Sequence, residues 1–403
     1  MAPSATAPSA TAPSQDGKSA ATIPGKEQTR TALKLSGALQ QFESRDLTAV
    51  IGTEFKNVQL VDWLSAPNSD ELLRDLAITI SQRNVVIFRR QDALDNDLQK
   101  VLVQRLGELS GKPSTSKLHI HPTVNVGVTE PVKDKEISVI DSSRGRIIFK
   151  GVQDRETIKA SNTGALTGSR KTNPGLRKNL LPDQWHSDIT FEPIPSDYAV
   201  LRLTKLPRTG GDTIFASGYD VYDRISPPFQ KLLEGLTATY GQPKFGKAAA
   251  INGYKLYTEE RGAPENVGDK LEAIHPVVRT NPVTGWKSIF AVGHHVQHIN
   301  GVTEQESRSL QDWFLRLIVE NHDLQVRVHW ENENDLVIWD NRSTYHAATP
   351  DYQGLGTRTG QRAVSLGERP YLDPASISRR EDLAAVEEAS IALLSLTAPG
   401  SDS

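Results

Sequence analysis

Short runs of β-branched and aromatic residues, each four to seven residues long, recur along the chain and constrain its fold more than any other feature. Runs of this length and composition are typical of β-strands. The predicted strands lie at 84–89 (NVVIFR), 198–204 (YAVLRLT), 212–215 (DTIF), 325–330 (QVRVHW) and 335–339 (DLVIW). In the run at 325–330, apolar and polar residues alternate, as a half-buried strand requires.

Helices are fewer, and two of them carry clear start patterns. Residues 69–80 have helical spacing of apolar side chains, Ser226-Pro227 places a cap and a proline at a helix start, and Thr303 with Glu306 forms a capping box. The 29 glycines and 23 prolines supply turns between the remaining elements. This balance predicts a β-rich α+β fold, with a double-sheet barrel and helices packed outside it.

The chain divides into segments of different character. Residues 1–30 repeat APSAT and contain almost no large apolar side chain, which predicts a disordered N-terminal tail. Residues 31–385 are expected to form one domain, followed by a C-terminal segment at 386–403. Within the domain, 141–184 is a long, polar and basic loop without periodicity, and it is a candidate active-site lid or a surface excursion.

Composition excludes several classes of function. The net charge of -3 gives no basic field for a nucleic-acid partner, and the absence of cysteine excludes disulfides, thiolate catalysis and iron–sulfur ligation. No apolar run is long enough to span a membrane, and the N-terminus has no hydrophobic secretory core. We therefore expect a cytoplasmic protein without a membrane partner, in which His, Asp or Glu must hold any metal.

The sequence WHSDITF at 185–191 places His186 and Asp188 two positions apart in a predicted strand. Because residues i and i+2 of a strand share a face, both side chains can reach one ion. The best third ligand is His346, which follows the predicted strand ending at Trp339. Two histidines and a carboxylate are the ligands of non-haem Fe(II) oxygenases, although a zinc hydrolase can use the same side chains.

Two arginines beyond the third ligand decide between these metals. Arg358 and Arg362 lie twelve and sixteen residues after His346, in a segment that leads into an apolar run. Guanidinium pairs with carboxylate in a planar, bidentate geometry, so Arg358 can hold the far carboxylate of 2-oxoglutarate. Arg362 is then left for another anion. The alternative for either side chain is a surface salt bridge.

From about residue 60 to 375, the chain resembles the taurine/2-oxoglutarate dioxygenase family of Fe(II) enzymes. The motifs that carry the resemblance occur in the family's order: LHIHP (118–122), WHSDITF (185–191), LPRTGGDTIFAS (206–217), HPVVRTNPVTG (275–285), IWDNRSTYHA (338–347) and the pair Arg358 and Arg362. The resemblance implies a distorted double-stranded β-helix, or jelly roll. It also implies oxidation of a small anionic substrate by O2 with 2-oxoglutarate as cosubstrate.

The resemblance also implies roles for individual residues. His186, Asp188 and His346 would bind Fe(II), while Thr213 and Arg358 would bind the 2-oxoglutarate carboxylate. The residues implied to contact substrate are His121, Phe191, Arg362 and His295, with His294 and His298 as further candidates for the pocket wall. His275 is expected to be packed or exposed rather than a ligand. Family members often self-associate, which leaves a homo-oligomer open.

Two departures from the family weaken the assignment of a plain taurine substrate. Pro182 stands where taurine dioxygenases carry an asparagine, and the pocket aromatic is replaced around Gly293-His294-His295. We expect oxidative cleavage of an alkyl sulfonate or a sulfate ester, with an amino acid, a purine or another small carboxylate as the alternative substrate. A zinc hydrolase and a non-catalytic jelly roll are the rivals from other classes, and both leave Arg358 unexplained.

Overall fold

The fold is taken from a computed structural model that describes residues 31–126, 132–141, 147–148, 150, 184–349, 351–352 and 354–397. The predicted tail at 1–30 lies outside the described residues, as do Pro182 and most of the predicted loop at 141–184. No helix in the described part of the chain is long and apolar enough to cross a membrane.

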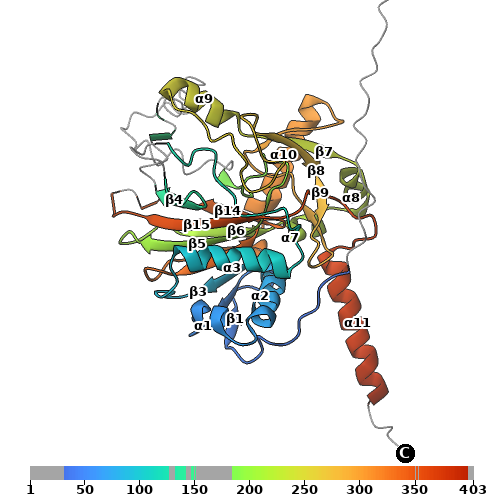
Figure 1. The fold of residues 1–403 in the computed structure, drawn as a ribbon. Coiled ribbons are helices and arrows are strands. Elements are labelled where there is room, and N and C mark those ends of the chain that lie inside the picture. Colours follow the sequence, from blue (N-terminus) through green and yellow to red (C-terminus); the bar gives the residue numbers. More distant parts are fainter. Residues whose placement is uncertain are drawn as a thin grey trace, which may run out of the picture.

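A seven-stranded sheet forms the centre of the molecule (Figure 1). In spatial order its strands are β1 (Ser44–Asp46), β2 (Thr53–Phe55), β3 (Val85–Phe88), β13 (Leu336–Asp340), β5 (Ser196–Lys205), β15 (Thr359–Leu366) and β4 (Ile137–Asp141). Only β2 and β3 pair in parallel, whereas the other neighbours are antiparallel. Several spatial neighbours in this sheet, such as β3 and β13 or β5 and β15, are therefore far apart in the sequence.

Three smaller sheets complete the β structure. One has the order β12 (Gln325–Val328), β6 (Thr213–Ser217) and β14 (Thr344–Ala348), and another has the order β11 (Val296–Ile299), β7 (Thr237–Gly241) and β8 (Glu272–Pro276). The third is a pair, β10 (Lys287–Ile289) and β9 (Val278–Thr280).

Helices flank these sheets. They are α1 (Leu60–Ser65), α2 (Ser69–Arg83), α3 (Asn96–Leu109), α7 (Gly218–Asp223), α8 (Pro227–Glu234), α9 (Pro243–Asn252), α10 (Glu304–Val319) and α11 (Arg379–Thr397), with a 3₁₀ turn η2 at His322–Leu324. Figure 1 shows α2 and α3 against the large sheet, and α11 extending away from the body. Helix α11 runs across position 385, so the predicted domain boundary there falls inside a helix.

The core follows from the alternation of side chains along the central strands. In β3, Val86 and Phe88 face the cluster under α2 and α3, while Val85 and Ile87 face a second cluster that also contains Phe215 of β6. Because successive strand residues point to opposite faces, a run without polar residues buries both faces. The second cluster lies between the large sheet and the β12-β6-β14 sheet, next to the candidate site.

Most predicted elements are confirmed. The five strand runs correspond to β3, β5, β6, β12 and β13, the helix at 69–80 is the first part of α2, and Thr303 forms the predicted capping box of α10. Ser226 precedes α8, but its side chain makes no capping hydrogen bond. The structure is thus a β-rich mixed chain with flanking helices.

One local prediction is wrong. The segment WHSDITF is not a strand, because only His186 forms a β-bridge, with His346, and the chain turns from Asp188 onward. Ile189 has a φ of 49°, a left-handed conformation that ends any extended pairing. The side chains of His186 and Asp188 therefore converge through a bridge and a turn, not through a shared strand face.

Candidate active site

The two histidines of the candidate site form a cross-strand pair. The His186 N–H donates to the His346 carbonyl at 3.1 Å, and the His346 N–H donates to the His186 carbonyl at 2.9 Å. Residues paired in this way project from the same face, and here the two imidazole centroids lie 4.3 Å apart. Backbone pairing between segments about 160 positions apart in the chain thus creates two thirds of the site.

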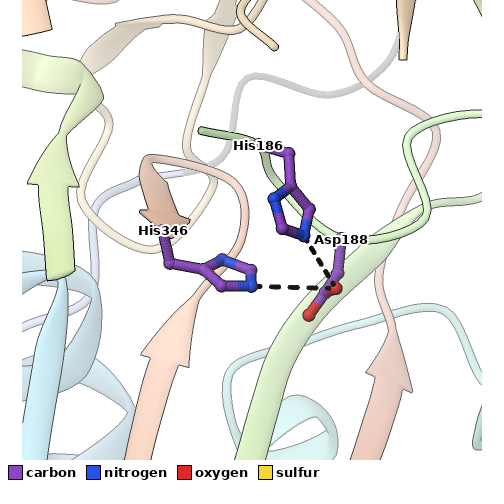
Figure 2. Close-up of side chains that lie close together, drawn as sticks. All are labelled: His186, Asp188 and His346. Atoms are coloured by element: carbon purple, nitrogen blue, oxygen red, sulfur yellow. Dashed lines mark ion pairs between the residues drawn. The ribbon is translucent and has the colours of Figure 1, made fainter. Parts of the chain in front are cut away.

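Asp188 completes a convergent group, as Figure 2 shows. Its Oδ1 lies 3.9 Å from Nε2 of each histidine, and one ligand atom from each of the three residues lies within 4.8 Å of the others. Bonds of about 2.1 Å to one ion place adjacent ligand atoms about 3 Å apart, so each histidine Nε2 need approach Asp188 Oδ1 by only about 1 Å.

The protonation states also suit a metal. Burial raises the pKa of Asp188, but Arg362 and the two histidines outweigh burial and lower it to about 2. Burial lowers the pKa of His346 to about 3 and also lowers the pKa of His186. An ionised carboxylate and two neutral imidazoles are the forms that bind divalent ions.

Hydrogen bonds orient the ligand atoms. His186 Nδ1 lies 2.9 Å from the Gln184 carbonyl, which can only accept, so the lone pair is on Nε2 and faces Asp188. Asp188 Oδ2 is buried and has no hydrogen-bond partner among the described residues. Because a buried carboxylate oxygen normally has a partner, this oxygen fits a bound cation. The three side chains therefore fit a divalent transition metal.

A second group of polar side chains lies near the ligand group, two residues further along β6 and β14. Phe215 of β6 pairs with His346 of β14, and Thr213 pairs with Ala348, so Thr213 lies on the same face as His346. Arg358 is buried, and its Nε donates to the Gly211 carbonyl at 2.7 Å. Its Nη2 lies 3.2 Å from Thr213 Oγ1. The structure thus brings Thr213 and Arg358 together beside the ligand group.

Trp330 is a member of this arrangement that sequence reasoning missed. Its indole Nε1 donates to Thr213 Oγ1 at 3.2 Å, and its ring lies under the Arg358 guanidinium, 5.8 Å from centroid to Cζ. With two N–H donors on its oxygen, the Thr213 hydroxyl must direct its own proton elsewhere. The alternating pattern at 325–330 predicts that Trp330 is buried but does not identify what it touches.

A cavity of about 250 Å³ opens beside the ligand group. The residues that line it are His121, Thr123, Ile148, His186, Asp188, Ile189, Phe191, Gln242, Phe245, His294, His295 and Arg362. Four of the predicted substrate contacts, His121, Phe191, Arg362 and His295, are therefore in its wall, whereas Thr213 and Arg358 are not. His298 is on β11 beside Glu304, 3.5 Å away, and does not line the cavity.

The predicted substrate residues differ in the hydrogen bonds that their side chains already make. Arg362 Nη1 donates to Asp188 Oδ1 at 2.6 Å, and its Nε is buried without a hydrogen-bond partner in the described part of the chain. His121 Nδ1 accepts the Thr123 N–H at 3.2 Å, which places the imidazole proton on Nε2. His295 Nδ1 lies 3.0 Å from Thr190 Oγ1.

Gly293 explains how the His294-His295 segment approaches the ligands. Its φ is 96°, and a Cβ there would lie 2.2 Å from the Trp185 carbonyl oxygen and 2.9 Å from the His186 Cα. Any side chain would therefore push the segment away from His186. The His294 ring lies 4.9 Å from the His186 ring as a result of this approach.

Comparison with known proteins agrees with this geometry. Residues 43–364 match the family model described as "Taurine catabolism dioxygenase TauD, TfdA family". The chain belongs to this family. It is 50% identical over 355 residues to alpha-ketoglutarate-dependent dioxygenase btcD of Neocamarosporium betae, a match that covers 87% of this chain and 97% of the relative.

Two further proteins extend the comparison. An alpha-ketoglutarate-dependent sulfonate dioxygenase of Saccharomyces cerevisiae is 29% identical over 333 residues, which cover 83% of this chain and 69% of the relative. A solved putative taurine dioxygenase from Burkholderia xenovorans shares the fold, with a TM-score of 0.57 at 22% identity over 83% of this chain and 96% of its own. The protein is therefore a dioxygenase dependent on 2-oxoglutarate, the α-ketoglutarate of these names.

Proposed function

We propose that this dioxygenase uses Fe(II) to oxidise a C–H bond of a small anionic substrate, with release of succinate and CO2. The observation that carries the proposal is the convergence of His186, Asp188 and His346, of which the first two line a cavity together with Arg362. Two neutral imidazoles and one carboxylate are the Fe(II) ligands of such oxygenases, and they leave positions open. Bound Fe(II), with 2-oxoglutarate and O2, supplies the oxidant that removes hydrogen from the substrate.

Thr213 and Arg358 are proposed to hold the far carboxylate of 2-oxoglutarate. The buried guanidinium offers a charge-assisted hydrogen bond, and the Thr213 proton is free to donate because its oxygen already accepts from Trp330 and Arg358. Diagonal neighbours on paired strands lie about 7–8 Å apart, so Thr213 and His346 are spaced for a small dicarboxylate that reaches from one to the other.

Arg362 and His121 are proposed to bind the anionic end of the substrate. The buried Nε of Arg362 is a donor that an anion would satisfy, and the His121 imidazole lies in the wall of the same cavity. Ile189, Phe191 and Phe245 give the cavity an apolar wall, which would bind the carbon chain and exclude water from it. Positioning of the C–H bond beside the ligand group is thus the contribution of the protein.

An alkyl sulfonate or a sulfate ester is our first choice of substrate. The name of the Saccharomyces cerevisiae relative supports a sulfonate, while that of the Neocamarosporium betae relative gives no substrate. Because Arg362 and His121 would hold a carboxylate equally well, an amino acid or a purine is the alternative outcome of the test.

The finer features of the protein are part of the same proposal. The β12-β6-β14 sheet faces the large sheet across a buried cluster, which supports a distorted jelly roll. A cytoplasmic location, a homo-oligomer and a lid at 141–184 remain predictions. Of that loop, Ile148 is described, and it lines the cavity with its carbonyl bonded to the Tyr254 hydroxyl at 3.2 Å.

The test measures succinate and sulfite in air with Fe(II), 2-oxoglutarate and a panel of sulfonates, sulfate esters, amino acids and purines. Stoichiometric succinate and sulfite from one sulfonate would establish both the chemistry and the substrate class. Succinate driven by an amino acid or a purine would keep the chemistry and refute the sulfonate. If no compound raises succinate although the protein binds Fe(II), the proposed class of small anionic substrates is wrong.

A further inference from the structure

Two buried histidines outside the ligand group contact the segment that carries Asp188. This segment, Ser187–Glu192, is called the ligand turn below. His275 of β8 has its Nε2 3.0 Å from the Thr190 carbonyl and 3.1 Å from the Glu192 carbonyl. Carbonyl oxygens only accept, so Nε2–H donates to both. His275 therefore bridges two carbonyl groups of the ligand turn.

His295 holds the same turn from another side. Its Nδ1 lies 3.0 Å from Thr190 Oγ1, within hydrogen-bond distance. His295 therefore contacts the turn two residues after Asp188. Although His295 lines the cavity, this hydrogen bond goes to the ligand turn, and His275 does not line the cavity at all.

The ligand turn needs such support because its backbone is strained. Ile189, directly after Asp188, is β-branched and has a φ of 49°, a region that such residues rarely adopt. A strained residue persists only where its surroundings hold it. His275 is itself held by a ring contact with Tyr240, at 5.0 Å between centroids, and His295 also packs against Phe191 of the ligand turn, at 5.1 Å.

We propose that His275 and His295 are positioning residues that hold the ligand turn so that the Asp188 carboxylate faces the two ligand imidazoles before metal binds. The proposal rests on the metal-binding role proposed above for Asp188. It predicts that loss of either contact weakens metal binding, even though neither histidine is a ligand. Removal of groups that orient metal ligands typically costs about 10–100-fold in metal affinity.

The test compares His275→Leu, which removes the donor at similar volume, with His275→Gln, which keeps an N–H donor. Mn(II) dissociation constants are measured by electron paramagnetic resonance, and amide hydrogen exchange of residues 187–192 is measured without metal. We expect the leucine variant to bind Mn(II) about 10–100-fold more weakly, with faster exchange in the ligand turn, and the glutamine variant to stay near wild type. His322→Leu, at an exposed histidine of η2, is the matched control.

Each outcome bears on one proposal. Wild-type affinity in a folded leucine variant, or equal weakening by leucine and glutamine, would overturn the role of the His275 donor. If the leucine variant does not fold, Thr190→Val decides, because it removes only the hydroxyl that contacts His295. We expect it to weaken Mn(II) binding severalfold, and unchanged affinity would overturn the positioning role. Failure of the wild type to bind Mn(II) would instead refute the metal site of the proposed function.

Discussion

The ion pair between Glu192 and Arg261 offers a quantitative test of how the ligand turn is anchored. The two side chains are about 1% exposed and form two hydrogen bonds, Nε to Oε1 at 2.5 Å and Nη2 to Oε2 at 2.9 Å. Arg261 also donates to the carbonyls of Tyr257 and Gly268. It thereby ties the end of the ligand turn to the loop at 257–268.

Replacement of Arg261 by methionine should destabilise the protein strongly. Removal of one partner of a buried pair costs about 3–5 kcal/mol, because the other charge stays buried and unpaired. The two lost contacts to carbonyls add about 1 kcal/mol each, which gives about 5–7 kcal/mol in total. A domain of ordinary stability unfolds with about 5–15 kcal/mol, so this loss is a large fraction of the whole.

The stability lost in the Arg261→Met variant should be smaller at lower pH. Burial raises the pKa of Glu192, but hydrogen bonds from His119 and Arg261 outweigh it and keep the pKa below the ordinary 4.5. In the wild type, this pair therefore contributes its full stability above the pKa that Glu192 has in the unfolded chain. That contribution is lost as the pH falls through the lower pKa of Glu192 in the folded protein. Without Arg261, burial raises the pKa of Glu192 in the folded state. Glu192 is then protonated as the pH falls, which removes the buried, unpaired charge. The difference in stability between the variant and the wild type therefore shrinks at lower pH.

Urea unfolding at pH 7.5 and pH 5.0 measures both quantities. Arg308→Met, which breaks an exposed pair with Glu304, is the control and should change little, since exposed pairs contribute little. Arg261→Lys should fall between the wild type and methionine, because lysine keeps the charge but loses the bidentate geometry. A loss of unfolding free energy below about 1 kcal/mol in the Arg261→Met variant, or a loss that does not shrink at pH 5.0, would refute the reasoning.

Three further predictions concern the site itself. Asp188→Asn keeps the volume but removes the charge, so it should abolish Mn(II) binding and 2-oxoglutarate turnover, and retained turnover with an unchanged fold would exclude Asp188 as a ligand. Trp330→Phe removes one hydrogen bond to Thr213, worth about 0.5–1.5 kcal/mol, so the KM for 2-oxoglutarate should rise about 2–10-fold with the substrate KM unchanged; an equal rise in both would contradict the role. Arg362→Gln should raise the pKa of Asp188, because Arg362 lowers it against burial, so Mn(II) titrations should lose affinity at higher pH than in the wild type, and identical pH profiles would count against the ion pair.

The sequence predicts the elements around the site well because their patterns are local. The runs that became β3 and β13 contain only apolar residues in their centres, and the capping box at Thr303 needs only residues three positions apart. The family motifs likewise identify the candidate ligands without any knowledge of the turn between them. Local pattern is therefore enough for the elements and for the list of candidate residues.

The geometry of the site could not be predicted in the same way. The run WHSDITF is rich in aromatic and β-branched residues and thus predicts a strand, yet the left-handed Ile189 and the pairing of His186 with His346 depend on contacts across the fold. No local pattern indicates that His295 hydrogen-bonds the ligand turn, or that Trp330 touches Thr213. Each of these contacts joins residues more than 100 positions apart.

The motif HPVVRTNPVTG at 275–285 shows how a segment can serve a site without lining it. His275 donates to the ligand turn, and Asn281 donates to the Asp340 carboxylate at 2.9 Å, on the segment that leads into the strand of His346. One short segment thus contacts both parts of the chain that supply ligands. Since neither side chain reaches the cavity, substitutions here should change metal affinity and stability before they change the choice of substrate. Substrate choice should depend instead on the cavity wall, where Arg362 and Phe191 lie.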